Sequence, residues 1–145
     1  MKQLKRAGLS NADLRCFYTT VVRPVLEYAC VVWHHGLTKA QSDRLEALQK
    51  RAIRIMFGRR AFDLSYDDLL SLSKLDALST RRSNLGKSFF IKILNPISCL
   101  HELLPPRRNT AITSKLRHAL QFEPPLIRTI RYTSFIDYAL AHYQN

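Results

Sequence analysis

The fold is decided by residues 10–58, which read SNADLRCFYTTVVRPVLEYACVVWHHGLTKAQSDRLEALQKRAIRIMFG. Apolar residues recur in this stretch at the three- and four-residue spacing of a helix, and basic residues occupy many of the positions between them. The stretch therefore predicts two long helices joined by a tight turn near Gly36. We expect the shorter elements that follow to pack against this pair.

The first predicted helix begins after Ser10, a good N-cap residue, and Asp13 lies where a carboxylate favours a helix start. Its apolar stripe consists of Leu14, Phe17, Tyr18, Val21 and Val22. Pro24 breaks or kinks this helix, because proline has no N–H to donate and its ring clashes with the preceding turn. Residues 25–33, VLEYACVVW, are almost wholly apolar. We interpret them as a buried helix, with a buried strand as the alternative.

The second predicted helix runs from Lys39 to Phe57 and is the best-specified element of the chain. Thr38 and Gln41 form a capping-box pattern at its start, and Gly58 suits the position just after its end. The residues predicted to face the core are Leu45, Leu48, Ala52, Ile55 and Met56. Those predicted to point away from it are Arg44, Lys50, Arg51 and Arg54.

The remainder of the chain predicts shorter elements. Ser65 caps a short helix whose first turn holds two aspartates, and three leucines follow to be buried. A longer helix is predicted over residues 76–94, with one side formed by Leu78, Leu85, Phe89 and Ile93. One or two helical turns are expected within residues 97–104, and Ser134 is expected to cap a terminal helix.

Together these elements predict an all-α protein, an irregular bundle of about five to six helices. Residues 105–129 are basic, rich in turn formers and weakly periodic, so we expect an extended basic segment near the C-terminus. We predict two domains, a helical domain over residues 1–95 and a C-terminal extension with a terminal helix over residues 96–145.

Charge is the strongest compositional signal. The chain of 145 residues carries 23 Lys and Arg against 11 Asp and Glu, a formal net charge of +12. Such an excess causes self-repulsion in a compact fold and favours a polyanionic partner. We expect that partner to be RNA or DNA; an anionic membrane surface is the weaker candidate, and a charge that only keeps the protein soluble is the alternative.

Three cysteines, an odd number, favour a reducing intracellular compartment. We expect them to be small buried apolar residues rather than disulfide partners. The basic N-terminus has no apolar core behind it, so it does not predict a secretory signal. No run approaches the roughly 18 apolar residues of a membrane span. We therefore expect an intracellular location, nucleus or cytoplasm, and no membrane partner.

Tyr66-Asp67-Asp68 has the residue types of a polymerase metal motif. In such motifs paired carboxylates hold two metal ions, and they lie on a tight hairpin between apolar strands near a further carboxylate. Here the triplet follows the N-cap residue Ser65 and precedes LLSLSKL, a helical pattern. The helix dipole explains two carboxylates in a first turn, so we interpret the triplet as structural.

No other motif predicts a catalytic or metal site. Cys30 and His34 have helical spacing, and Cys99 lies close to His101, but paired Cys-x2–4-Cys spacings are missing. No nucleophile elbow and no phosphate-cradling glycine loop occurs. We therefore expect no metal, no cofactor and no independent catalysis.

Basic residues supply the remaining functional signal. The predicted phosphate-binding residues are Arg44, Lys50, Arg51, Arg54, Arg59, Arg60, Arg81 and Arg82. Further basic residues follow at Lys87, Lys92, Arg107, Arg108, Lys115, Arg117, Arg128 and Arg131. Lys and Arg that contact phosphates release counterions, which gives sequence-independent, salt-sensitive binding. A solvated helix face is the alternative interpretation.

Several stretches resemble the polyprotein of non-LTR (LINE-like) retrotransposons, in the part that follows the polymerase palm of jockey-type elements. The similar stretches are LRCFYTTVVRPVLEYACVVWHHGLT (14–38), RLEALQKRAIRIMFG (44–58), SYDDLLSLSKLDALSTRR (65–82), ISCLHELLPP (97–106) and RYTSFIDYALAHYQN (131–145). The most specific parts are RPVLEY (23–28) followed by Trp33, and QKRA (49–52).

In that family the parent polypeptide carries an endonuclease and an RNA-directed DNA polymerase, and it copies its own RNA at nicked chromosomal DNA. The resemblance implies that residues 1–95 correspond to the helical thumb, which grips the template–primer duplex. It also implies that the catalytic palm lies outside this chain, which would be a truncated or degenerate element. We expect Tyr28 and Trp33 to belong to the core rather than to stack on bases.

Three hypotheses follow. The favoured one is a non-catalytic fragment of a reverse transcriptase that binds template–primer nucleic acid through a basic helical face. The second is a helical interaction module that packs on the missing polymerase palm and has no nucleic-acid binding of its own. The third, an autonomous enzyme, needs a metal or nucleophile site that the residues do not predict.

Overall fold

The computed structural model describes residues 1–109, 120–123, 126 and 134–144. Within these residues the chain is all-α, as predicted, and its one β-type contact is an isolated bridge between Arg107 and Phe122. Most of the basic segment predicted between residues 105 and 129 lies outside the described residues.

The chain forms two compact units and crosses between them after Tyr28, after Leu37 and after Arg82, the last time within one helix. Unit 1 comprises Met1–Tyr28 and Thr38–Arg82, and unit 2 comprises Ala29–Leu37 and Ser83–Asn145. The predicted domain boundary after residue 95 falls within unit 2, and the two-domain division stays a prediction.

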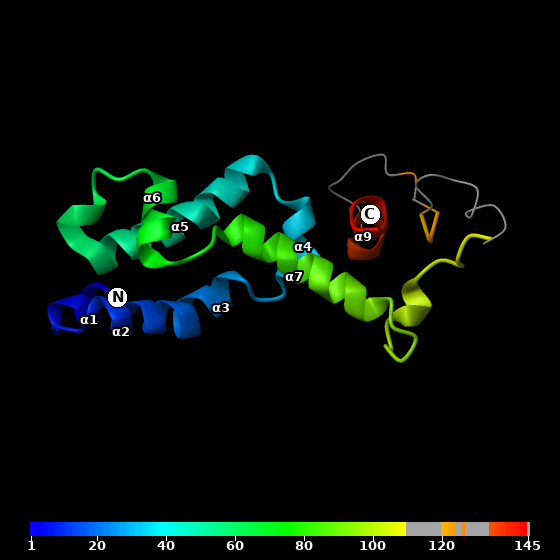
Figure 1. Cartoon of the computed structure of the whole chain (residues 1–145), viewed down its shortest axis with the longest axis horizontal. Coiled ribbons are helices and arrows are strands. Elements are labelled where there is room, and N and C mark those ends of the chain that lie inside the picture. The colour runs from blue at the N-terminus through cyan, green and yellow to red at the C-terminus, as the bar shows by residue number, and fades with distance from the viewer. Residues whose placement is uncertain (110–119, 124–125, 127–133, 145) are drawn as a thin grey trace. The chain divides into compact units, whose positions relative to one another are not determined.

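Unit 1 is built around one long helix. Its elements are α1 (Lys2–Arg6), α2 (Asn11–Phe17), the π-helical turn η1 (Tyr18–Val22), α3 (Arg23–Leu26), α5 (Lys39–Phe57), the 3₁₀ turn η3 (Gly58–Ala61), α6 (Tyr66–Ser73) and the start of α7 (Leu78–Ile93). In Figure 1, α1, α2 and α6 lie against α5. The helix α5 therefore forms the centre of this unit.

Local capping sets the helix starts, as the sequence predicts. At α2 the Asp13 N–H donates to Ser10 Oγ (3.2 Å) and the Asp13 carboxylate accepts from the Ser10 N–H (3.2 Å). Thr38 and Gln41 form the same reciprocal pair at the start of α5. Gly58 follows α5 with φ of 63°, a conformation that costs glycine little. The predicted bounds of α5 are confirmed.

Pro24 interrupts the first helix in a specific way. The backbone widens into the π-helical turn η1 and then continues as α3, in whose first turn Pro24 lies. A first turn tolerates proline because its N–H groups have no partner within the helix. The predicted break at Pro24 is thus confirmed and takes the form of a π-helical turn.

The prediction of a buried helix over residues 25–33 is wrong. The segment forms two short helices, α3 and α4 (Cys30–Trp33), and Ala29 between them has a left-handed backbone with φ of 48°. Cys30 is buried, whereas Val25, Val32 and Tyr28 are exposed, the last of them by 79%. Apolar composition alone predicted burial, but only tertiary packing determines which of these side chains is covered.

The core of unit 1 uses only part of the predicted stripe of α5: Ala52 and Met56 are buried as predicted, whereas Leu45 and Ile55 are half-buried. The buried members of this core are Leu14, Tyr18, Ala52, Ile53, Met56, Ala61, Leu69 and Leu75. On α5 the polar residue Gln49 is buried as well, whereas Leu48, predicted to face the core, is exposed. Burial of Gln49 is possible because other elements satisfy its hydrogen bonds, which periodicity cannot reveal.

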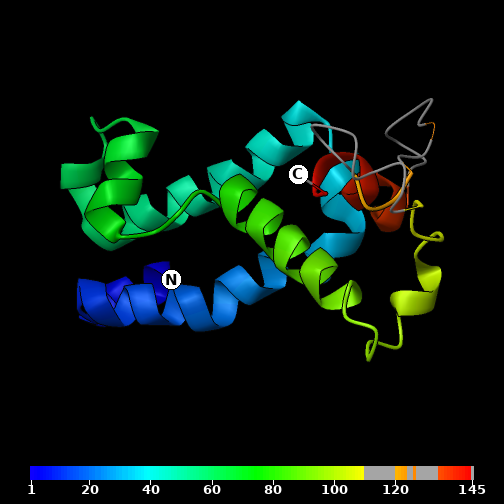
Figure 2. The same cartoon turned by 45° about the vertical axis from the view of Figure 1, so that its right-hand side comes forward.

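Unit 2 contains α4, the 3₁₀ turn η2 (His34–Gly36), the rest of α7, the 3₁₀ turn η4 (His101–Leu103) and α9 (Phe135–His142). Its core comprises Phe90, Phe122, Ala139 and Leu140, and Figure 2 shows α9 beside α4. Gly86 lies within α7, where an added Cβ would come within 3.1 Å of Tyr143 Oη. The short turn near residue 101 and the Ser134-capped terminal helix are confirmed.

Candidate nucleic-acid interface

The predicted basic strip of α5 contributes to a groove in unit 1. Lys50, Arg51 and Arg54 line it, and they are joined by Lys2, Lys5 and Arg6 of α1. The groove has a volume of about 740 Å³. We call it the cationic groove, and its lining residues are Lys2, Lys5, Arg6, Ala47, Lys50, Arg51, Arg54, Ile55, Gly58 and Phe62.

Six of the ten residues that line the cationic groove are basic and none is acidic. Within the part of the chain that the structure describes, none of the six forms an ion pair with a carboxylate. A second groove of about 630 Å³ in the same unit differs in charge, with Asp67, Asp76 and one cation, Lys74, in its lining. The cationic groove therefore gathers six basic side chains with no carboxylate in its lining.

The three cations of α1 were not among the predicted site residues. They lie about 45 residues before the α5 cations in sequence, and only the packing of α1 on α5 brings them together. A signal was present, because Lys2, Lys5 and Arg6 have the spacing of one helix face. Arg44, Arg59 and Arg60 are exposed but do not line the groove.

The remaining surface of the groove is apolar, and an aromatic ring stands in it. Phe62 follows η3 and is 62% exposed. The guanidinium carbon of Arg54 lies 5.9 Å from the centre of the Phe62 ring, a cation–π contact. The buried Nε of Arg54 has no hydrogen-bond partner among the described residues. Much of the hydrogen-bonding capacity of this side chain is therefore not used by the protein.

Arg81 and Arg82 do not line the cationic groove; burial speaks against Arg82 as a phosphate contact, and the assignment of Arg81 stays a prediction. Arg81 pairs with Glu27 through Nε to Oε1 (2.8 Å) and Nη2 to Oε2 (3.3 Å), and this hydrogen bonding raises the pKa of Arg81. Arg82 is 0% exposed, donates to Ser42 Oγ (3.2 Å) and lies 4.0 Å from the Glu46 carboxylate. A side chain without solvent-accessible surface cannot reach a phosphate in this conformation.

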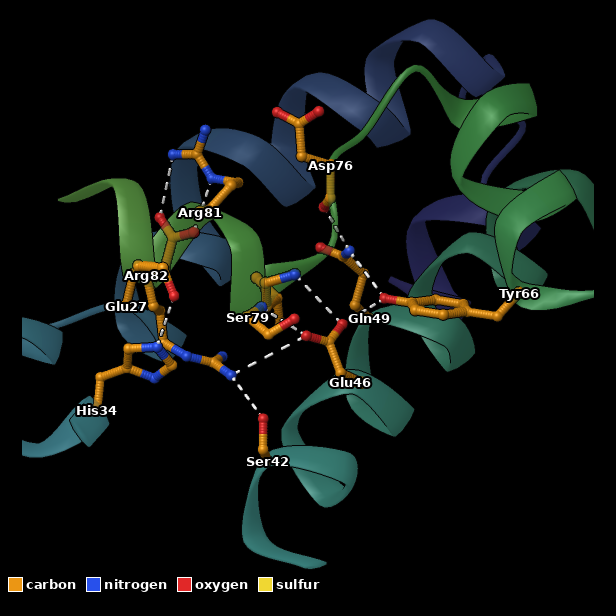
Figure 3. Close-up of polar contacts among 12 residues, drawn as sticks. Glu27, His34, Ser42, Glu46, Gln49, Tyr66, Asp76, Ser79, Arg81 and Arg82 are labelled. Carbon is orange, nitrogen blue, oxygen red and sulfur yellow. Dashed lines mark hydrogen bonds and ion pairs between the residues drawn. The ribbon is translucent and has the colours of Figure 1, made fainter. Parts of the chain in front are cut away.

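A polar cluster centred on Glu46 and Gln49 of α5 connects three helices of unit 1 (Figure 3). The Glu46 carboxylate of α5 accepts from the Tyr66 hydroxyl of α6 and from the N–H groups of Leu78 (3.2 Å) and Ser79 (2.6 Å) at the start of α7. Ala77 has no side chain that can cap α7, so Glu46 performs this task from another helix.

Gln49 is the second member of the cluster. Its Oε1 accepts from the Tyr18 hydroxyl (2.7 Å), and its Nε2 donates to Tyr66 Oη (3.1 Å) and to the Asp76 carbonyl (2.9 Å). Burial raises the pKa of both tyrosines well above the usual value, and for Tyr66 the hydrogen bond to Glu46 acts in the same direction. The four residues of the QKRA stretch (49–52) thus lie on two sides of α5. Gln49 and Ala52 are buried, and Lys50 and Arg51 line the cationic groove.

Tyr66, Asp67 and Asp68 occupy the first turn of α6, which confirms their helical interpretation. The Asp68 N–H donates to the Ser65 hydroxyl (3.2 Å), the expected cap. Both aspartates are exposed, and within the described ranges no cluster of three His, Cys, Asp or Glu has the geometry of a metal site.

Two cysteines differ from expectation. Cys30 is buried, but Cys16 and Cys99 are exposed, because α2 turns Cys16 away from the core and Cys99 lies in the turns after α7. None of the helices that the structure describes is long and apolar enough to cross a membrane.

Comparison of the chain with protein-family models, curated proteins and solved structures found no match. The similarity to non-LTR retrotransposons therefore stays a prediction from the residues quoted above.

Proposed function

We propose that the chain is a non-catalytic, nucleic-acid-binding fragment derived from the RNA-directed DNA polymerase of a non-LTR retrotransposon. In this role it holds RNA or DNA, including a template–primer duplex, in the nucleus or cytoplasm. The observation that carries the proposal is the cationic groove, where α1 and α5 bring together six basic side chains without a carboxylate.

The chemistry of the groove favours a phosphate chain. Each contact between a cation and a backbone phosphate releases a counterion, so binding falls steeply with salt. If all six cations were engaged, log K against log[salt] for a duplex would have a slope of about −5. Contacts of this kind read no base edges, so we propose binding without sequence specificity.

The proposed role involves no chemistry on the nucleic acid. Asp67 and Asp68 are committed to a helix start, and the polymerase aspartates that the resemblance implies would lie in a separate palm. The function is therefore retention and positioning of a strand.

The test is fluorescence anisotropy of a labelled RNA–DNA duplex between about 50 mM and about 200 mM salt, the range in which phosphate contacts are most sensitive. The double substitution Arg51→Gln/Arg54→Gln should weaken binding at least tenfold and make the salt slope shallower by about 2. The matched control Lys87→Gln/Lys92→Gln removes the same charge from α7, outside the groove. An equal loss in both variants would show diffuse attraction rather than a groove and would refute the proposal.

One observation favours the second candidate function, a module that packs on a polymerase palm. Val21 on η1 and Val25 on α3 are exposed four residues apart, and the exposed Tyr28 lies in the turn after α3, so apolar side chains face solvent in this part of unit 1. This candidate predicts self-association that rises with protein concentration, together with no duplex binding at low salt. Sedimentation of the wild-type chain beside Val25→Ser, which replaces one of these apolar side chains, distinguishes the two functions.

A further inference from the structure

Phe62 is positioned at the cationic groove by its neighbours. Ala61 is fully buried in the core of unit 1, and the Phe62 N–H donates to the Arg59 carbonyl (3.1 Å). These contacts hold the backbone, while Phe62 as a residue remains 62% exposed, with the Arg54 guanidinium 5.9 Å from the centre of its ring. The groove thus presents an exposed aromatic ring beside the Arg54 guanidinium and in the same lining as five other cations.

A duplex uses only part of such a surface. Its outside offers phosphates and sugars, which suit the cations, but its bases are stacked inside and cannot reach Ala47, Ile55 or Phe62. Unpaired nucleotides offer both chemistries, because their phosphates lie beside bases with free π-faces. A charged groove that also contains an exposed aromatic ring is the arrangement that suits single strands.

We infer that the cationic groove takes single-stranded nucleic acid, with one unpaired base stacked on the Phe62 ring and the flanking phosphates on the cations of α1 and α5. The inference deepens the proposed function and rests on it. On a template–primer, the groove would engage the unpaired strand next to the duplex. Arg54 contributes twice, because its guanidinium both orders the Phe62 ring and supplies positive charge beside the stacked base.

The experiment compares two labelled probes on the full chain, oligo(dT) of about ten nucleotides and a duplex of the same length. Phe62→Leu keeps the apolar character of the site but removes the π-face. It should weaken oligo(dT) binding by about 5- to 150-fold, the range for one stacked base, and weaken duplex binding by a smaller factor, because a duplex contacts the groove through its phosphates. Phe62→Trp should keep oligo(dT) affinity, and its fluorescence, measured relative to the wild type with its single Trp33, should be quenched by the single strand.

Each outcome separates this inference from the proposed function. If Phe62→Leu changes neither affinity while Arg51→Gln weakens both, phosphate binding stands and the single-strand inference falls. Equal loss on both probes, or wild-type binding of inorganic polyphosphate as tight as that of oligo(dT), also overturns it. If the wild type binds neither probe, the proposed function itself fails. If Phe62→Leu lowers the melting temperature, its weaker binding could reflect a damaged fold. In that case the fluorescence of Phe62→Trp is the test, and fluorescence that the single strand does not quench refutes the inference.

Discussion

Replacement of Glu46 by alanine should remove about 2.5–6 kcal/mol from the free energy of unfolding, because this carboxylate connects α5, α6 and α7. The substitution deletes the acceptor for the Tyr66 hydroxyl and for the first N–H groups of α7. It also deletes the carboxylate 4.0 Å from the buried Arg82 guanidinium.

The magnitude follows from three losses. Loss of a helix cap costs about 0.5–2 kcal/mol. Loss of the acceptor of a part-buried hydroxyl costs about 1–2 kcal/mol. Breaking a buried ion pair costs about 3–5 kcal/mol when the charges are in close contact, but here the pair is 4.0 Å apart and Arg82 keeps its bond to Ser42, so about 1–2 kcal/mol is expected.

The assay is urea unfolding followed by far-ultraviolet circular dichroism, with the midpoint and slope fitted separately. Asp43→Ala is the matched control, since it removes the same charge from an exposed position of the same helix and should cost no more than about 0.5 kcal/mol. Glu46→Gln keeps one acceptor oxygen and should fall between the wild type and Glu46→Ala.

Two results would refute this reasoning. A loss below about 1 kcal/mol for Glu46→Ala would mean that the cap and the ion pair contribute little. Wild-type stability of Glu46→Gln would mean that the charge of Glu46 has no part in holding α7.

Two further predictions concern stability. The raised pKa of the buried Tyr18 keeps it protonated in the folded state above pH 10, where tyrosine ionises in the unfolded chain. Stability is therefore complete below about pH 10 and should fall by about 1.4 kcal/mol per pH unit above it from this residue alone. The slope of unfolding free energy against pH should be shallower in Tyr18→Phe; an unchanged slope would contradict the assignment. Lys74 ends α6 with φ of 53°, so Lys74→Gly should stabilise the fold by about 0.5–1 kcal/mol. Thermal melting beside the exposed control Lys92→Gly, which should destabilise, tests this prediction.

Much of the secondary structure could be predicted from the sequence. The starts of α2, α5, α6 and α9 were found because each depends on a hydrogen bond between residues three apart, which the order of residues already contains. The helical setting of Asp67 and Asp68 was found for the same reason. Three of the six cations of the groove, Lys50, Arg51 and Arg54, were also predicted, because they recur at helical spacing on α5.

Only the tertiary structure decided which side chains are covered and which charges remain free. The buried Gln49 bonds to Tyr18 and Asp76, and the buried Arg82 bonds to Ser42, partners that lie far away in the sequence. The α1 cations join those of α5 because the two helices pack together. Periodicity identifies a face of a helix, but burial and pairing depend on partners tens of residues away, and their positions are set by packing rather than by local order.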